Sequence, residues 1–271
     1  MTVTRAPARH FNSFPVQWVA LRPVLRLALF SSTALVAALA IGTPRAHAAT
    51  FTVANEADLA NAITTANGNA EADTINVTGN ITLTGSLPVL DDADGVTIDL
   101  GGNTVSGGGA NRIFFVNSGT ATIQNGMLAD GFAQGGAGGL ADDLDNGAGG
   151  GGMGAGGALF VRGDTAPTVA VNGVSFSNNA AQGGDGGSIG TADVGSGGGG
   201  GLGGDGGSSI GATADWGGGG GGGAFADGAD TSTDNGGAGG GPNGGSGGIV
   251  GGAGPTAGGD LSGGGGGADL Q

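Results

Sequence analysis

Two clusters of aspartates are the side chains whose type and spacing could support catalysis in this sequence. They are Asp91, Asp92 and Asp94, followed by Asp142, Asp143 and Asp145. Two carboxyl groups can cleave a glycosidic bond, one acting as acid and the other as base or nucleophile. Both clusters lie in turn-forming sequence, however, and no aromatic residue that could hold a sugar ring stands close by. We therefore interpret them as solvated turns, and keep a carbohydrate-active β-helix enzyme using paired Asp as an alternative.

The composition after residue 48 excludes several other chemistries. This part of the sequence contains no Cys, His, Lys or Tyr, so it cannot assemble a serine or cysteine triad, a lysine Schiff base or a typical zinc site. Its basic residues are Arg112 and Arg162, against 22 acidic residues, which gives a net charge of −20. A chain this acidic lacks the basic patch that nucleic acid or an anionic membrane requires. We expect no catalytic residue, no cofactor and no metal.

Two shorter motifs suggest ligands and are better explained in other ways. Residues 200–208 nearly fit a nine-residue calcium-binding repeat, but Gly207 stands where a bulky apolar residue belongs. Calcium in such repeats is shared between consecutive turns, so a single imperfect copy in glycine-rich sequence predicts no site. Arg162-Gly163-Asp164 spells an integrin-binding tripeptide directly after a predicted strand, and we interpret it as an exposed turn.

The first 48 residues have the features of an export signal. Four arginines precede an apolar run, residues 27–41, that carries no charge. Ala46-His47-Ala48 then matches the small-x-small pattern of a cleavage site, with Ala46 and Ala48 as the small residues. The run is shorter than the roughly 18 to 20 residues that a membrane-spanning helix needs. We predict a signal peptide over residues 1–48, with an uncleaved N-terminal anchor as the alternative.

Residues 49–181 contain short runs of β-branched and aliphatic residues separated by Gly, Asn, Asp and Ser. Most runs alternate apolar and polar residues, which is typical of a strand with one buried face. Comparable runs recur every 20 to 25 residues, as at Ile75, Ile98 and Ile123, and such a repeat indicates units that stack on one another. With no helical pattern between the runs, we predict an all-β fold, a parallel β-helix. Parallel crossovers are almost always right-handed, so we expect a right-handed solenoid.

A short helix is predicted at the start of this solenoid, over residues 56–67. Asn55 can cap it, and Glu56 and Asp58 complement the helix dipole. Leu59 and Ile63 lie on one narrow apolar face. Because a helix this short is marginal alone, we expect it to cover the open end of the first coil.

Two glycine-rich segments interrupt and follow the solenoid. Residues 134–155 are interpreted as a Gly- and Asp-rich insertion that loops out from one corner. Residues 182–271 contain 43 glycines, and ordering each glycine costs on the order of 0.5 to 1 kcal/mol relative to Ala. Few large apolar side chains accompany them. We therefore predict a largely irregular, low-complexity region, with a glycine-rich continuation of the solenoid as the alternative.

Two motifs in the solenoid resemble those of a known family. Gly156-Gly157-Ala158-Leu159, followed by Phe176 and Asn179, resembles the paired GGA(I/L/V) and FxxN motifs of polymorphic outer membrane proteins. These are autotransporters whose surface-exposed passenger is a right-handed β-helix. Residues 51–53, the helix after them and residues 72–75 are similar to the start of many exported bacterial β-helix proteins, and together the two resemblances cover residues 51–181. It implies a passenger that precedes a membrane barrel, whereas this sequence ends in glycine-rich residues rather than in the alternating strands of a barrel. A downstream translocator barrel is therefore an expected partner.

These observations lead to one expected function and two alternatives. We expect an exported bacterial protein of the cell surface or outer membrane, a non-enzymatic, adhesin-like passenger. Its mechanism would be display, with a rigid rod presenting a recognition surface to a glycan or protein ligand. The alternatives are the carbohydrate-active enzyme and a structural glycine-rich envelope protein.

Overall fold

The computed structural model describes residues 48–141, 147–189, 195–210, 217–231, 235–241, 244–249, 253–259 and 261–266. Ala46 of the predicted cleavage site lies outside these ranges, as do the rest of residues 1–47 and the aspartates Asp142, Asp143 and Asp145. Ala48 is the first described residue and is exposed. Residues 47–271 form one compact unit. No helix within the described ranges is long and apolar enough to span a membrane.

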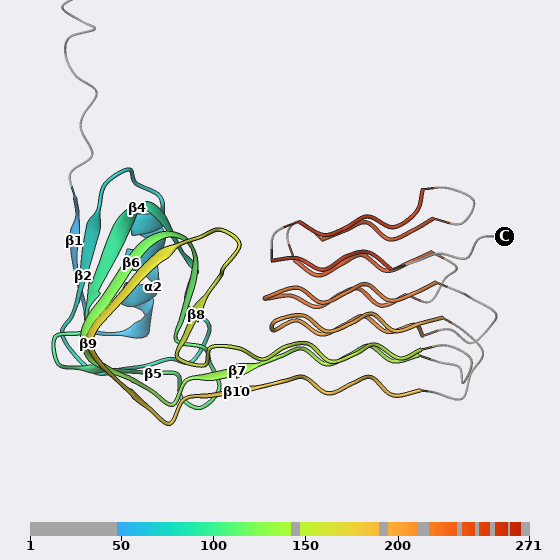
Figure 1. Ribbon diagram of the computed structural model, residues 1–271, viewed down its shortest axis with the longest axis horizontal. Helices are drawn as coiled ribbons and strands as arrows, with labels where there is room; N and C mark the ends of the chain where they lie inside the picture. The colour runs from blue at the N-terminus through green and yellow to red at the C-terminus, as the bar shows by residue number, and fades with distance from the viewer. Residues whose placement is uncertain are drawn as a thin grey trace, which may run out of the picture. The chain divides into compact units, whose positions relative to one another are not determined.

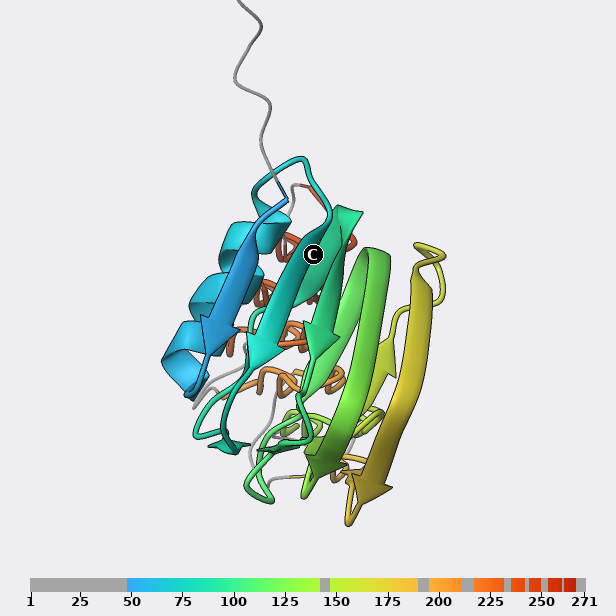
Figure 2. The ribbon, with the colours of Figure 1, turned by 90° about the vertical axis from the view of Figure 1, so that its left-hand side faces the viewer.

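The centre of the fold is a mostly parallel, curled β-sheet with one helix packed against it (Figures 1 and 2). The strands are β1 (Thr50–Val53), β2 (Asp73–Val77), β3 (Ile81–Thr82), β4 (Leu90–Asp99), β5 (Thr104–Ser106), β6 (Phe114–Ala129), β7 (Phe132–Gln134), β8 (Leu159–Val161), β9 (Thr168–Ser177) and β10 (Ala180–Gln182). The main sheet has the order β1-β2-β4-β6-β5-β3, β8 and β9 also pair with β6, and β7 pairs with β10. All of these pairings are parallel. The expected parallel β structure is therefore confirmed.

The predicted stack of isoleucines is also confirmed. Ile75 on β2 pairs with Ile98 on β4, which in turn pairs with Ile123 on β6. None of these three side chains is exposed to solvent. Val171 on β9 stands opposite Ile123. Because the side chains of paired residues lie on the same face of a sheet, successive strands build one continuous apolar row.

Helix α2 (Glu56–Asn67) has the predicted bounds and the predicted cap. The Oδ1 atom of Asn55 accepts the N–H of Asp58 at 3.0 Å, which satisfies one of the free donors of the first turn. The buried face of the helix consists of Leu59, Ala62, Ile63 and Ala66. This face packs into the same apolar core as the isoleucine stack.

Both ends of α2 are hydrogen-bonded to the segment that leads from β3 into β4. The carboxylate of Glu56 accepts the N–H of Thr84 at 3.0 Å and the Thr84 hydroxyl at 2.7 Å. At the other end, Asn67 donates to the carbonyl oxygen of Val89 at 2.7 Å and accepts the N–H of Asp91 at 3.0 Å. The hydroxyl hydrogen bond from Thr84 is the largest of several that hold the pKa of Glu56 below its ordinary value. These hydrogen bonds therefore fix both ends of α2 to residues 84–91, which lead from β3 into β4.

The last strand of the main sheet has an open edge. β9 pairs with β6 and with no other strand of the described ranges. The side chains of Val171 and Phe176 on this strand are 39% and 53% exposed. An unpaired edge with exposed apolar side chains invites pairing with another strand.

The glycine-rich segments differ from the irregular structure that we predicted. We call their described parts the glycine runs: residues 135–141, 147–155, 183–189, 195–210, 217–231, 235–241, 244–249, 253–259 and 261–266. Figure 1 shows them as extended traces side by side. Hydrogen bonds between runs recur every three residues, since the N–H groups of Gly149 and Gly152 bind the carbonyl oxygens of Gly139 and Gly136. Residues 195–210 and 217–231 each fold back on themselves, because the N–H of Gly198 binds the carbonyl oxygen of Gly207 and the N–H of Gly220 binds that of Ala229. A period of three residues in each extended limb is typical of a polyproline II-type helix.

The close approach of neighbouring runs explains their glycine content. A Cβ atom on Gly149 or Gly152 would lie less than 3.0 Å from main-chain atoms of another run, whereas one on Gly150 would have nothing within 4 Å. Met153 stands three residues after Gly150, at the same outward position, and is 64% exposed. Between residues 149 and 154, Gly is thus required at two positions of every three. Each hydrogen bond between runs contributes about 0.5–1.5 kcal/mol, which offsets the entropic cost on which our prediction of an irregular segment rested.

Candidate functional site

The two halves of the glycine and asparagine motif meet at one corner of the sheet, beside Gly131. Asn179 accepts the N–H of Gly131 through Oδ1 at 2.7 Å and donates through Nδ2 to the carbonyl oxygen of Leu128 at 2.9 Å. A Cβ atom on Gly157 would lie less than 3.0 Å from the carbonyl oxygens of Gly131 and Ala180. Both halves of the motif therefore hold the turn from which the chain enters the glycine runs.

The other residues of the motif stand in or before the strands. Gly156 has a φ of 63°, a backbone conformation that favours Gly. Ala158 is buried, and Leu159 begins β8. Phe176 stands opposite Leu128, but about half of its side chain is exposed because β9 is the last strand of the sheet. Gly156, Ala158 and Leu159 thus have structural roles, whereas Phe176 is largely exposed to solvent.

The aspartates of the first cluster stabilise a turn within β4. Asp91 accepts hydrogen bonds from Asn117, at 3.2 Å, and from the hydroxyl of Ser118 on the next strand. Asp92 is buried, and its Oδ1 atom accepts the N–H of Asp94 at 2.9 Å. The other carboxylate oxygen of Asp92 is buried without a hydrogen-bond partner among the described residues. The carboxylates of Asp91 and Asp92 therefore hold the chain in place.

Residues 200–208, which resemble a calcium repeat, belong to the glycine runs. The carboxylate of Asp205 accepts the N–H of Ala137 at 2.6 Å, and the N–H of Asp205 binds the carboxylate of Asp227 at 2.8 Å. The aspartate that suggested a calcium ligand thus links three runs. Among the described residues, no group of three or more Asp, Glu, His or Cys side chains is placed to hold a metal ion.

The Arg162-Gly163-Asp164 tripeptide lies between β8 and β9. The guanidinium of Arg162 forms an ion pair with Asp164 and donates to Oδ1 of Asn117 at 3.0 Å. The hydrogen bond from Arg162 is the largest cause of a lowered pKa at Asp164. Only 13% of the Arg162 side chain is exposed. The cation of the tripeptide is therefore directed toward the sheet, while its carboxylate is exposed and paired.

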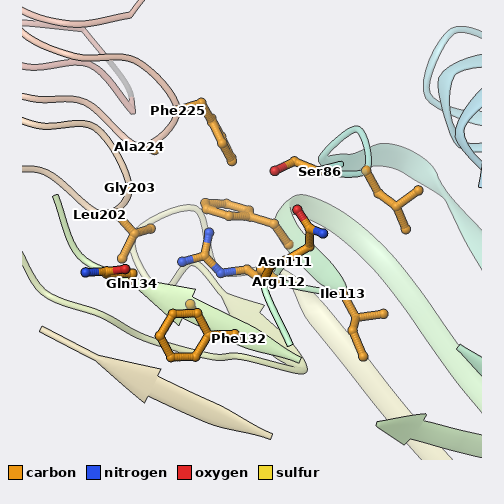
Figure 3. A pocket seen from close by; sticks show the side chains of 14 residues that line it. Ser86, Asn111, Arg112, Ile113, Phe132, Gln134, Leu202, Gly203, Ala224 and Phe225 are labelled. Carbon is orange, nitrogen blue, oxygen red and sulfur yellow. The ribbon is translucent and has the colours of Figure 1, made fainter. Parts of the chain in front are cut away.

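A cavity of about 380 Å³ was not anticipated from the sequence (Figure 3). It is lined by the segment that enters β6, by β7 and by residues of the glycine runs. Arg112 is the one charged residue among those that line it. In the view of Figure 3 Gln134 and Leu202 lie to one side of its guanidinium, and the rings of Phe132 and Phe225 lie on other sides of the cavity. The cavity thus combines aromatic walls with a single cation.

Arg112 is held by a carbonyl group and by aromatic rings. Its Nε and Nη2 atoms donate to the carbonyl oxygen of Ala155 at 3.2 and 3.1 Å. Its Cζ atom lies 5.5 Å from the ring centroid of Phe115 and 5.4 Å from that of Phe160, distances typical of cation–π contacts. The ring of Phe225 lies 5.3 Å from that of Phe115. Burial lowers the pKa of Arg112, yet a guanidinium stays protonated at neutral pH.

Sequence reasoning missed this site because its walls come from distant segments. Leu202 and Phe225 belong to the region that was predicted to be irregular. The one available signal was rarity, because Arg112 and Arg162 are the two basic residues after residue 48.

Comparison of the chain with protein-family models, curated proteins and solved structures finds no match. The resemblance to polymorphic outer membrane proteins therefore rests on the motif residues around Gly157 and Asn179.

Proposed function

We propose that the protein is an exported, non-enzymatic surface passenger. In this proposal the stacked strands form a right-handed β-helix and the glycine runs display side chains as an adhesin-like recognition surface. The observation that carries the proposal is the three-residue hydrogen-bond period of the glycine runs. Because main-chain groups hold neighbouring runs together, an outward side chain is free to vary without loss of the scaffold.

The side chains that the glycine runs expose support a role in recognition. Large apolar residues stand on them with about half or more of their surface exposed: Leu140, Met153, Ile189, Ile210 and Ile249. Exposed apolar groups on a rigid array supply contact area for a glycan or protein ligand at little cost in ordering. The net charge of −20 after residue 48 disfavours nucleic acid and anionic lipid as ligands.

Recognition is tested with the purified full chain on immobilised matrix proteins and glycans. We expect binding that is weakened by Met153→Ser together with Leu140→Ser. Thr97→Ser, on β4 away from the glycine runs, is the control and should bind like the unmodified chain. Failure to bind any surface, or equal binding by the double variant, contradicts the adhesin proposal.

Export is tested separately by expression in a bacterium with an outer membrane. The N-terminus of the exported product should be Ala49, next to the predicted cleavage position at Ala48. A product that still begins at Met1 contradicts cleavage. Cleavage of an acidic polysaccharide that is lost in Asp91→Asn would instead favour the carbohydrate-active enzyme.

A structural envelope protein is the second candidate, and the open edge of β9 favours it. This strand carries no charged residue, and charges are a common protection of an edge against pairing. Sedimentation velocity measures self-association directly. Assembly that Val171→Lys abolishes would favour the envelope protein over a monomeric passenger.

A further inference from the structure

The charge of Arg112 is not balanced by an acidic side chain. Arg162 is paired with Asp164, whereas no Asp or Glu lines the cavity around Arg112. Partial burial of a cation without a counter-ion is unfavourable. In a chain with 22 acidic residues, this arrangement leaves a position for an external anion.

The guanidinium also has a free edge for such an anion. Nε and Nη2 of Arg112 are both directed to the carbonyl oxygen of Ala155. The opposite edge, formed by Nη1 and the second hydrogen of Nη2, has no hydrogen-bond partner among the described residues. That edge presents two parallel N–H donors, the geometry that matches the two oxygens of a carboxylate.

The remaining walls of the cavity suit a flat apolar group. Phe115, Phe132 and Phe225 all line it, and the rings of Phe115 and Phe225 lie 5.3 Å apart. Phe225 is 51% exposed, so part of its ring is available to cover a ligand. A volume of about 380 Å³ falls within the range of about 300–1,000 Å³ that is usual for small-molecule sites.

We infer that this cavity binds a small organic carboxylate with a flat apolar body, its carboxylate on the free edge of Arg112 and its body against the phenylalanine rings. This inference does not depend on surface display, because the outward side chains proposed for display, Leu140 and Met153, do not line the cavity. Benzoate is the simplest probe of this class. Benzamide has the same shape without the charge, acetate has the charge without the ring, and glucuronate has the charge on a polar ring.

The test is a titration of the full chain with each probe, followed by amide NMR shifts and by calorimetry. We expect benzoate to bind at least about tenfold more tightly than benzamide, because a hydrogen bond between two charged groups is roughly twice as strong as one between neutral groups. Benzoate should also bind at least about tenfold more tightly than acetate, because its ring is buried against the phenylalanine side chains. The shifts should centre on Ala133, Gln134 and Phe225. Absence of benzoate binding, or equal binding of benzamide, overturns the inference. Tighter binding of glucuronate than of benzoate would contradict the proposal that the ligand has an apolar body.

Variants separate a ligand-binding role of Arg112 from a structural one. Arg112→Gln should weaken benzoate binding by at least about tenfold, and Arg112→Lys by less, because it keeps the charge but loses the fork. Arg162→Gln removes the other cation outside the cavity and should leave binding unchanged. If Arg112→Gln fails to fold, Phe225→Ala provides the second variant, since its exposed ring permits truncation and its loss should weaken benzoate but not acetate. Unchanged benzoate binding in these cavity variants contradicts the inference.

Discussion

The Oδ1 atom of Asn179 accepts the N–H of Gly131 at 2.7 Å, across 48 residues of sequence. The same side chain donates to Leu128, so one amide ties the turn after β9 to the turn after β6. A hydrophobic stack fixes strands but leaves the main-chain groups of its corners without partners. Asn179 satisfies one main-chain donor and one main-chain acceptor at this corner, and so keeps the two turns in register.

Asn179→Ala should destabilise the fold by about 1–3 kcal/mol, because it leaves one N–H and one carbonyl group of that corner without their partner. Urea denaturation followed by circular dichroism measures the loss. Asn172→Ala is the matched control, since Asn172 is exposed on β9. Equal stability of the two variants would show that the corner does not depend on this amide.

Ile98→Ala should destabilise the fold by about 2–5 kcal/mol, the usual cost of truncating a fully buried isoleucine. Ile98 stands between Ile75 and Ile123 in the stack and is 0% exposed. Thr97→Ala, on the opposite face of β4, should cost far less. Denaturation midpoints of the two variants make the comparison, and a larger loss for Thr97→Ala would contradict the inward orientation of Ile98.

Gly152→Ala and Gly150→Ala should differ although they are two residues apart. A methyl group at Gly152 collides with the main chain of a neighbouring run, and one at Gly150 meets nothing within 4 Å. We expect a loss of about 1–3 kcal/mol for Gly152→Ala, and a change within about 0.5 kcal/mol for Gly150→Ala.

Hydrogen exchange reports this difference locally. The N–H of Gly152 is bonded to Gly136, and the N–H of Gly184 is bonded to the carbonyl oxygen of Gly152. Exchange at both amides should accelerate in Gly152→Ala and stay slow in Gly150→Ala. Fast exchange at both amides in the unmodified chain would contradict an ordered array.

Acid should loosen α2 through Glu56. The pKa of Glu56 is lowered in the folded chain, first by the Thr84 hydroxyl. A lowered pKa means that this stabilisation is complete above the ordinary value of 4.5 and is lost as the pH falls through the folded value. Glu56→Gln should therefore flatten the stability profile below about pH 4.5. Glu71→Gln, whose carboxylate has no hydrogen bond among the described residues, serves as the control in thermal melts at each pH.

The strands and the helix were predictable because their signals are local or repeat at short range. The spacing of Ile75, Ile98 and Ile123 reflects strands that stack in chain order. Asn55 marks the start of α2 because it is a favourable N-cap residue. The glycine runs were missed for a physical reason. The prediction weighed the entropy of glycine against apolar contacts, whereas main-chain hydrogen bonds between runs provide the compensation.

The sequence did contain a signal for these runs. Gly-Gly-x triplets follow one another in residues 200–208 and again in 236–241, a period of three that fits neither a strand nor an α-helix. The cavity around Arg112 left no comparable signal, because Leu202 and Phe225 reach it from segments about 90 to 113 residues away.

The close contact at Gly152 and the open space at Gly150 also constrain how this chain diverges. Most nucleotide changes in the first two bases of a glycine codon add a side chain, so they are selected against at the enclosed positions and accepted at the outward ones. Related genes should therefore accumulate amino-acid differences in every third codon of these segments. The exposed side chains can then change between relatives while the hydrogen bonds between the glycine runs are kept.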